Sequence, residues 1–212
     1  MNARLNVLRP LAAAALVAGL IGYGCAEKAA FKAVKIGEPA PEFTLPDATG
    51  KPVSLSEAEG KYVVLEWHNL GCPFVKKHYG GGNMQALQKR FTKKGVLWYS
   101  IISSAPGKQG FMEPKQAREH FKKVGGSPTA VLLDPDGKVG RLYGAKTTPH
   151  MYVIDPKGVL RYNGAIDDIA SADPDDVKDS KNYVAAALES LMEGGAVDEP
   201  LTRPYGCSVK YK

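Results

Sequence analysis

The stretch Tyr62-Val63-Val64-Leu65-Glu66-Trp67-His68-Asn69-Leu70-Gly71-Cys72-Pro73-Phe74-Val75-Lys76-Lys77-His78 contains a strand, a turn and a helix start in succession. Its first four residues form an apolar, β-branched run, which is typical of a central strand covered on both faces. Residues 69–71 can turn the chain, and Pro73 is favoured at the first position of a helix. The stretch therefore predicts that Cys72 lies at a helix N-terminus.

A cysteine in that position is favoured as a thiolate. The first amides of a helix are unpaired, and together with the helix dipole they stabilise negative charge on Cys72. Lys76 and Lys77, one turn further on, are expected to add to this effect. The alternative is an inert buried cysteine, which is common in proteins. Val75 stands where a Cys-x-x-Cys motif would have its second thiol, so the sequence lacks a local redox pair.

Length and composition indicate one globular domain with additional segments. The chain has 212 residues, 44% hydrophobic and 24% charged, which indicates neither disorder nor a membrane bundle. We expect residues 1–24 to be a signal peptide, residues 25–35 a linker, residues 36–195 the domain and residues 196–212 a C-terminal tail that carries Cys207.

The N-terminal segment indicates export. Arg4 and Arg9 precede an apolar run at residues 11–21, which is too short to span a membrane but typical of a signal-peptide core. Small residues precede Cys25, so cleavage directly before Cys25 would give a lipoprotein attached to the periplasmic face of a membrane. Cleavage nearby would give a soluble periplasmic protein, and both alternatives stay open. Export implies an oxidising compartment in which Cys72 and Cys207 can form a disulfide.

Charge gives no indication of a nucleic-acid partner. Removal of the signal lowers the formal net charge from +6 to about +4. The basic cluster at residues 89–94 belongs to one expected helix and is read as its solvated face. We expect no nucleic-acid binding, no cofactor and no membrane contact other than a lipid on Cys25.

The remaining pattern alternates strands with helices. Residues 43–55 predict an N-terminal β-hairpin, Ser56 a short helix and Asn83 the cap of a second helix after Gly80-Gly81-Gly82. Further expected strands are residues 96–102, 130–133, 151–154 and 159–162, and further expected helices begin near residues 113, 139 and 184. This order predicts an α/β fold with a central mixed sheet flanked by helices.

Four segments in this order resemble the redoxin branch of the thioredoxin superfamily, that is, the alkyl hydroperoxide reductase and thiol-specific antioxidant family with its peroxiredoxin-like relatives. They are Gly37-Glu38-Pro39-Ala40-Pro41-Glu42-Phe43-Thr44-Leu45, Gly50-Lys51-Pro52-Val53-Ser54-Leu55, the strand before Cys72-Pro73, and Thr148-Pro149 before Val153-Ile154-Asp155. The resemblance covers residues 36–191. It implies a thioredoxin-like fold and a thiol-dependent oxidoreductase with antioxidant relatives.

The resemblance also implies site residues. Pro149 corresponds to the cis-proline that faces the nucleophile and, with Thr148, presents backbone groups to substrate; otherwise it starts an edge strand. Glu66 takes the place of a buried acid whose raised pKa allows proton transfer, or else lies at the solvated end of its strand. Trp67, Pro73 and the loop at residues 103–112 are expected to shape the substrate groove.

Two departures from the family concern the reaction. Typical peroxiredoxins have Pro and Thr where this chain has Leu65 and Asn69, and the place of their arginine falls near Pro149. The peroxide-activating set is therefore incomplete, whereas thiol–disulfide exchange requires only a low-pKa thiolate and room for an incoming sulfur. Cys207 is a candidate resolving thiol; a structural or intermolecular disulfide is the alternative.

Histidines give a further alternative. His68, His78 and His150 are expected near Cys72 or Pro149. A copper site would combine Cys72 with His150 or His78, although no metal site is expected with one cysteine in place.

We therefore expect an exported thiol-dependent oxidoreductase in which Cys72 attacks a disulfide of a protein or a hydroperoxide. Cys207 or an external thiol reductant then resolves the intermediate. The alternatives are a peroxiredoxin-like peroxidase proper and a non-catalytic thioredoxin-fold module that binds proteins or carries metal.

Overall fold

The computed structural model describes residue 1 and residues 34–212. The described residues 34–212 belong to the second of the two units into which contacts divide the chain, Phe31–Lys212. The expected signal peptide and Cys25 lie outside the described residues. Among the residues that are described, no helix has the length and apolar character needed to cross a membrane.

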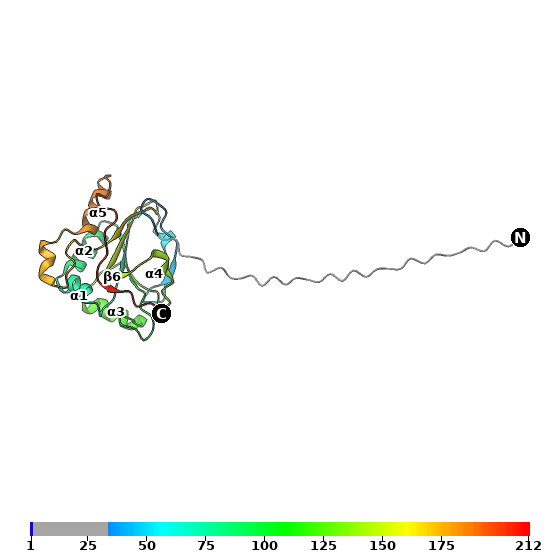
Figure 1. Cartoon of the computed structure of the whole chain (residues 1–212), viewed down its shortest axis with the longest axis horizontal. Coiled ribbons are helices and arrows are strands. Elements are labelled where there is room, and N and C mark those ends of the chain that lie inside the picture. The colour runs from blue at the N-terminus through cyan, green and yellow to red at the C-terminus, as the bar shows by residue number, and fades with distance from the viewer. Residues whose placement is uncertain (2–33) are drawn as a thin grey trace. The chain divides into compact units, whose positions relative to one another are not determined.

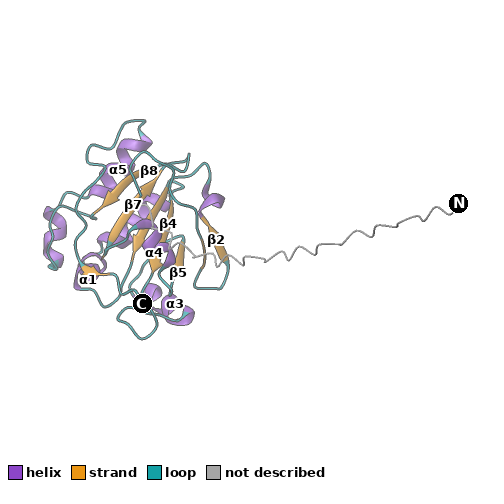
Figure 2. Ribbon diagram, turned by 45° about the vertical axis from the view of Figure 1, so that its right-hand side comes forward, coloured by secondary structure: helices purple, strands orange, loops and turns teal. Residues whose placement is uncertain are grey.

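The second unit is built on a five-stranded mixed sheet with the strand order β5-β4-β3-β7-β8 (Figure 2). Strands β3, β4 and β5 are parallel, whereas β7 runs antiparallel to β3 and β8 antiparallel to β7. The strands are β3 (Val63–Trp67), β4 (Leu97–Ile102), β5 (Ala130–Leu133), β7 (His150–Ile154) and β8 (Leu160–Gly164). This arrangement confirms the predicted α/β fold with a central mixed sheet, and β7 and β8 form the expected hairpin.

Helices and a small hairpin flank this sheet (Figure 1). The α-helices are α1 (Pro73–Gly80), α2 (Asn83–Thr92), α3 (Pro114–Lys123), α4 (Lys138–Tyr143) and α5 (Tyr183–Met192); the short 3-10 helices are η1 (Leu55–Ala58) and η2 (Pro174–Asp179). The N-terminal hairpin consists of β1 (Thr44–Pro46) and β2 (Pro52–Ser54), as predicted. A third, two-stranded sheet pairs β6 (Thr147–Thr148) with β9 (Cys207–Ser208).

Two buried clusters lie on the two faces of the sheet, because successive residues of a strand point to opposite faces. Val64 packs on one face with residues of α1, α2, α3 and α5, such as Val75 and Met84. Val63 and Leu65 pack on the other with α4, η1 and the β1–β2 hairpin. The central strand β3 is fully buried on both faces, as its apolar run indicates.

Two expected helix caps are wrong. Gly82, with φ 72°, is the N-cap of α2 rather than Asn83, which is the first residue of the helix. Glycine takes this left-handed conformation without the steric cost that a side chain adds, and Asn83 instead donates from its amide to His78. The helix expected at Ser56 begins one residue earlier, at Leu55, with Ser54 as its N-cap.

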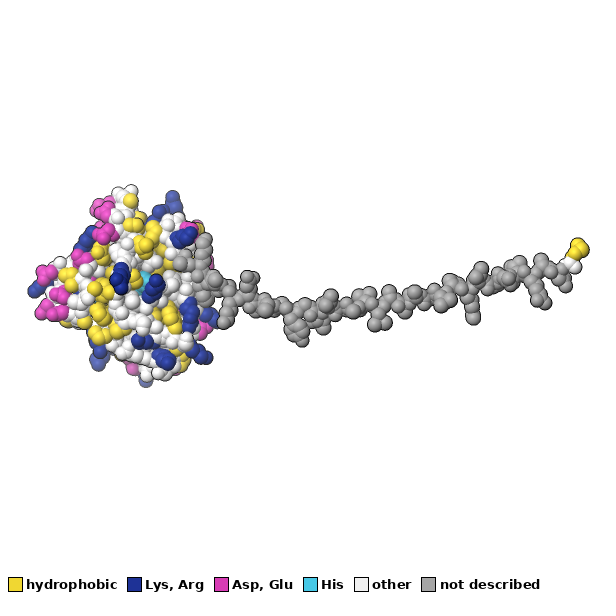
Figure 3. Space-filling model, viewed as in Figure 1, with side chains coloured by type: hydrophobic (Ala, Val, Ile, Leu, Met, Phe, Trp, Pro, Cys, Tyr) yellow, Lys and Arg dark blue, Asp and Glu magenta, His cyan; other side chains and the backbone are white. Residues whose placement is uncertain are grey.

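The chain after α5 differs most from expectation. The sequence predicts a tail over residues 196–212, with no periodicity that indicates a helix or strand. Residues 200–212 of this tail, called the C-terminal strap below, cross the domain and include β9, which pairs with β6 (Figure 1). Elsewhere on the surface, acidic side chains gather over η2 (Figure 3), which contains Asp175 and Asp176 in its first turn.

Candidate functional site

Cys72 is the N-cap residue of α1, directly after the turn that leaves β3. Its backbone is extended, and its amide donates to the carbonyl of Asn69 at 3.0 Å. Pro73 occupies the first turn of the helix, as the sequence predicts. The side chain of Cys72 is 0% exposed, so a reagent cannot reach the sulfur without movement of the surrounding chain.

The Thr148–Pro149 peptide bond is cis and faces Cys72, as the resemblance implies. The Cys72 thiol donates a hydrogen bond to the carbonyl oxygen of Thr148 at 2.9 Å. Cys72 at the helix start is therefore in direct contact with the segment between α4 and β7. Cys72 is buried next to this loop and not in a purely hydrocarbon environment.

The C-terminal strap covers this contact. In the β6–β9 pair, Cys207 is the register partner of Thr148, the residue whose carbonyl accepts from Cys72. Gly206 allows this close approach because a Cβ there would lie 2.1 Å from the Thr148 carbonyl oxygen, and its φ of 125° disfavours any side chain. Cys72 and Cys207 are both free thiols.

The surroundings of Cys72 favour its ionised form. Burial raises the pKa of the thiol, but the backbone amides of Cys207 and Val75 and the hydroxyl of Thr148 lower it, and the resulting pKa is below the ordinary value. Val75 is the third residue of α1, so its amide is one of the unpaired donors at a helix start. The carbonyl of Thr148 opposes these groups, since it accepts a hydrogen bond only from the protonated thiol.

The two thiols have opposite pKa shifts. Burial, a hydrogen bond with Cys72 and the charge of Cys72 raise the pKa of Cys207. Cys72 therefore ionises first and Cys207 retains its proton. This order suits an attacking thiolate and a second thiol that acts later.

The expected contribution of the lysines is wrong for Lys77. Its side chain is fully buried and its ammonium group lies 3.1 Å from Asp167, with a second hydrogen bond to the carbonyl of Ile169 at 2.7 Å. Lys76 is exposed. Backbone amides and a hydroxyl, rather than these lysines, are the groups that lower the Cys72 pKa.

Glu66 is completely buried in the cluster on the α1 side of the sheet. One carboxylate oxygen accepts from Tyr79 at 2.8 Å, and the other accepts from Trp98 at 2.8 Å, Ser100 at 2.8 Å and Gln88 at 3.1 Å. The expectation of a buried acid is therefore correct, and the alternative of a solvated strand end is wrong.

The raised pKa expected for Glu66 is also wrong. Burial raises the pKa of Glu66. Hydrogen bonds from His68, Trp98 and Ser100 lower it, as does the electrostatic interaction with His68, and the resulting pKa is below the ordinary value. A carboxylate that accepts several hydrogen bonds stays ionised. This arrangement favours a structural anion over a proton carrier for Cys72.

Trp67 does not contact a substrate groove. It is 0% exposed, packs against Tyr143 and Tyr152 on the α4 side of the sheet, and its indole N–H donates to Ser103 at 3.0 Å. The period of two along β3 points Trp67 and Glu66 to opposite faces. Pro73, by contrast, is exposed beside Cys72.

The three histidines expected near the nucleophile are buried in separate networks. His68 contacts Glu66 at 3.4 Å and His120 at 3.0 Å, His78 contacts Tyr205, and His150 contacts Asn163. Within residues 34–212, no three His, Cys, Asp or Glu side chains are placed to hold a metal ion.

The loop at residues 103–112, which is expected to shape a substrate groove, lines a hollow. Ser104, Pro106, Phe111 and Met112 contribute to an apolar hollow of about 310 Å³ beside the ends of β4 and β5. The same loop contacts the turn before Cys72, because the side-chain amide of Asn69 donates to the carbonyl of Gln109 at 3.2 Å. Asn69 also accepts from the amide of Gly71, so both ends of this amide are engaged.

This fold, with a buried cysteine at a helix start opposite a cis-proline, defines a thioredoxin-like protein of the thiol-dependent oxidoreductase class, as expected. Residues 36–163 match the AhpC/TSA family, and the chain belongs to that family.

Relatives are consistent with this assignment. The chain is 32% identical over 127 residues to the thiol-disulfide oxidoreductase ResA of Bacillus subtilis, a match that covers 60% of this chain and 65% of that protein. It is 29% identical over 137 residues to MT2597 of Mycobacterium tuberculosis, named as a candidate peroxiredoxin, with 62% of this chain and 78% of that protein covered.

Solved structures show the same fold. An uncharacterized conserved protein of Geobacillus kaustophilus superposes with a TM-score of 0.72 at 26% identity, over 84% of this chain and 93% of that one. A candidate thiol:disulfide interchange protein, DsbE, of Chlorobium tepidum gives a TM-score of 0.51 at 27% identity, over 62% of this chain and 85% of that one.

Several residues around the site were not expected from the sequence. Asp167 and Tyr205 meet Lys77 and His78 although they lie 38 residues apart, and His120 reaches His68 from α3. None of these contacts follows from spacing along the chain.

Proposed function

We propose that this protein catalyses thiol–disulfide exchange with Cys72 as the nucleophile and Cys207 as the resolving thiol. The observation that carries the proposal is the β6–β9 register, which sets Cys207 opposite Thr148 and brings its amide to the Cys72 sulfur. The relatives named as thiol-disulfide oxidoreductases support the same reaction.

The reaction has two exchange steps. The Cys72 thiolate attacks one sulfur of a substrate disulfide, forms a mixed disulfide and releases the first substrate thiolate. Cys207 then loses its proton and attacks the Cys72 sulfur, which releases the second substrate thiolate and leaves a Cys72–Cys207 disulfide. The substrate disulfide is reduced, and an external thiol reductant returns both cysteines to the thiol form.

The residues around the cysteines have distinct parts in this proposal. Thr148 and Pro149 position the backbone beside Cys72, and the exposed Pro73 contacts the incoming substrate. A hollow of about 610 Å³ reaches Thr147, Tyr205 and Gly206 beside Cys207, which gives the external thiol an approach from that side. Glu66 stabilises the sheet beneath the site and takes no proton.

The test is to trap each intermediate. The reduced protein is mixed with a glutathione redox buffer, and non-reducing peptide mapping should show a Cys72–Cys207 disulfide. Cys207→Ser should accumulate the mixed disulfide at Cys72, whereas Cys72→Ser should lose at least ~100-fold in reduction of a disulfide substrate. Cys25→Ser is the matched control and should behave as the wild type. Absence of the Cys72–Cys207 disulfide, or full activity in Cys72→Ser, contradicts the proposal.

Reduction of hydroperoxides is a second candidate, favoured by the family and by the resolving thiol beside Cys72. In that reaction the Cys72 thiolate attacks the terminal oxygen of the hydroperoxide, the O–O bond breaks, the alcohol leaves and Cys72 becomes a sulfenic acid. The Cys207 thiol then attacks the Cys72 sulfur and displaces water to form the same disulfide. Fast labelling of Cys72 by a sulfenate probe after dilute peroxide would favour it. Asn69 stands where typical peroxiredoxins have the Thr of their peroxide-activating set. Both ends of its side-chain amide are engaged with backbone groups and do not point to a peroxide, so we rank this reaction second.

A non-catalytic role is the third alternative. A thioredoxin-fold module that binds proteins or carries metal would retain its function in Cys72→Ser. For the enzyme, in contrast, the proposed substrates are proteins with accessible disulfides.

Export and attachment of a lipid to Cys25 rest on the sequence of residues 1–25. We expect the mature protein in the periplasm, free or attached to a membrane through Cys25. Cell fractionation of the wild type and Cys25→Ser tests both: release of the variant from the membrane fraction indicates lipidation, whereas retention of the wild type in the cytoplasm contradicts export.

A further inference from the structure

The C-terminal strap encloses the nucleophile through contacts on both sides of Cys207. Before Cys207, the amide of Thr202 donates to Asn163 at 3.2 Å and its hydroxyl contacts Tyr162 at 2.6 Å. After Cys207, Lys210 accepts from the amide of Ala105 at 2.8 Å. Because Cys72 is 0% exposed beneath this segment, any substrate requires the strap to move.

Tyr205 connects the strap to α1, the helix that begins at Cys72. Its hydroxyl donates to Asp167 and lies 3.0 Å from the Nε2 atom of His78. Its ring packs against Phe74 with 5.7 Å between the ring centroids, and the Lys77 ammonium group lies 5.6 Å from the ring centroid. Tyr205 therefore contacts α1 over its first two turns, two residues before Cys207.

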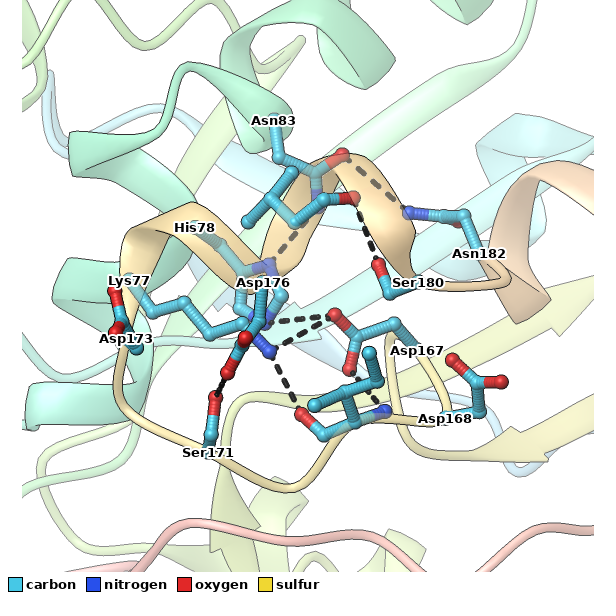
Figure 4. Close-up of polar contacts among 12 residues, drawn as sticks. Lys77, His78, Asn83, Asp167, Asp168, Ser171, Asp173, Asp176, Ser180 and Asn182 are labelled. Carbon is cyan, nitrogen blue, oxygen red and sulfur yellow. Dashed lines mark hydrogen bonds and ion pairs between the residues drawn. The ribbon is translucent and has the colours of Figure 1, made fainter.

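The groups that receive Tyr205 form a closed polar network (Figure 4). Asp167 is 1% exposed; its second oxygen binds Lys77 at 3.1 Å, and Lys77 also donates to Ile169. Asn83 donates to the Nδ1 atom of His78 at 2.9 Å, so the other ring nitrogen carries the proton and donates to Tyr205. While Tyr205 is in place, its hydroxyl therefore accepts from His78 and donates to Asp167, whose Oδ1 atom also accepts from the amide of Ile169.

We propose that the Tyr205 hydroxyl is the latch that holds the C-terminal strap closed over Cys72, and that Asp167, Lys77 and His78 on the domain are its catch. Tyr205 is thus a positioning residue that acts through the strap. Removal of its hydroxyl leaves the Oδ1 atom of Asp167 with one donor, the amide of Ile169 at 3.3 Å, and leaves the buried His78 N–H without its acceptor. These losses apply only while the strap is closed, since water reaches both groups when it opens. The closed state is therefore the state that loses stability.

This inference rests on the proposed function, because it states how access of the substrate to Cys72 is controlled. Hydrogen bonds to charged groups are strong enough that the loss of this one should raise the open fraction of the strap by about 10-fold or more. The effect is measurable without any redox partner. A failed latch therefore leaves the exchange reaction intact, and a failed exchange reaction leaves the latch intact.

The experiment compares Tyr205→Phe with Tyr62→Phe. The Tyr62 hydroxyl donates to the carbonyl of Leu191 at 2.8 Å, so the control also loses a tyrosine hydrogen bond, but one whose acceptor belongs to α5 and not to the strap. The reduced proteins are treated with N-ethylmaleimide, and peptide mapping by mass spectrometry follows modification of Cys72 separately from Cys207 and Cys25. Hydrogen exchange is measured in parallel on the amides of Val209 in the strap and of the β3 strand.

Tyr205→Phe should raise the rate of Cys72 alkylation by about 10-fold or more and speed exchange at Val209, with β3 unchanged. Tyr62→Phe should change the alkylation rate less than about 2-fold. An unchanged rate in Tyr205→Phe overturns the latch. Equal increases in both variants, or faster exchange throughout β3, overturn it as well, because they show a general loss of stability.

Discussion

Glu66→Gln distinguishes a structural anion from a proton carrier beneath the nucleophile. The substitution keeps the shape of the side chain and removes its charge. The glutamine amide can take the place of the oxygen that faces Tyr79 and His68, because the tyrosine hydroxyl can rotate to accept and the Nδ1 atom of His68 accepts in its other tautomer. The remaining oxygen then keeps the donors Gln88, Trp98 and Ser100, but as neutral hydrogen bonds.

The magnitude follows from these three contacts. Hydrogen bonds to a charged group contribute about 1.5–3 kcal/mol and neutral ones about 0.5–1.5 kcal/mol, a difference of about 1 kcal/mol each. Glu66→Gln should therefore lower the free energy of unfolding by about 3 kcal/mol at pH 7. Since the pKa of Glu66 is lowered in the folded state, the wild type has this stability above the unfolded pKa and loses it as the pH falls through the folded pKa.

Urea unfolding at pH 7 measures the free energy of unfolding, and the rate of disulfide reduction by the folded variant measures function. Glu189→Gln is the control, because Glu189 is a partly exposed carboxylate paired with Arg90 and should change stability by less than about 1 kcal/mol. We expect Glu66→Gln to react within about 3-fold of the wild type. Unchanged stability together with a ~100-fold slower reaction would show that Glu66 carries protons and would refute this reasoning.

Two further perturbations test the buried histidines and the strap. Burial lowers the pKa of three histidines to about 4, namely His78, His120 and His150. The unfolded chain, with histidine pKa values of about 6.5, binds more protons, so stability should fall as the pH drops from about 6.5 to 4. His150→Gln should reduce the number of protons taken up on unfolding in this window by about one, measured from the pH dependence of urea unfolding; an unchanged slope would contradict a neutral buried imidazole. Gly206→Ala places a Cβ 2.1 Å from the Thr148 carbonyl oxygen and should speed Cys72 alkylation by about 10-fold or more, whereas Gly80→Ala, which meets no atom within 4 Å, should not. Equal rates in these two glycine variants would show that the strap does not depend on close approach at Gly206.

Local patterns were sufficient for the fold and for the place of Cys72 at a helix start. The apolar run of β3, the turn and Pro73 predicted the helix start at Cys72, because helix caps and strand periodicity depend on neighbours in the chain. The family resemblance correctly implied the cis bond before Pro149 and the burial of Glu66.

Neighbours along the chain do not determine the ionisation of buried groups. The sequence shows a glutamate and a strand, but the pKa of Glu66 depends on donors from Tyr79, Trp98 and Ser100, which reach it through packing. Lys77 likewise follows Cys72 by five residues, which predicts that its charge stabilises the Cys72 thiolate. Its ammonium group instead binds Asp167, which lies 90 residues further along the chain. In both cases the effect of a charge depends on its three-dimensional neighbours.

The sequence by itself determined the strands of the sheet and the helix start with Cys72 as its cap, because those features arise from residues a few positions apart. Tertiary structure alone decided that the C-terminal strap lies over Cys72 and that Cys207 faces Thr148. The physical reason is that a segment without periodicity gains its order from hydrogen bonds and ring contacts supplied by the folded domain, such as those of Tyr205 with Asp167 and Phe74. These partners come together only when the chain has folded.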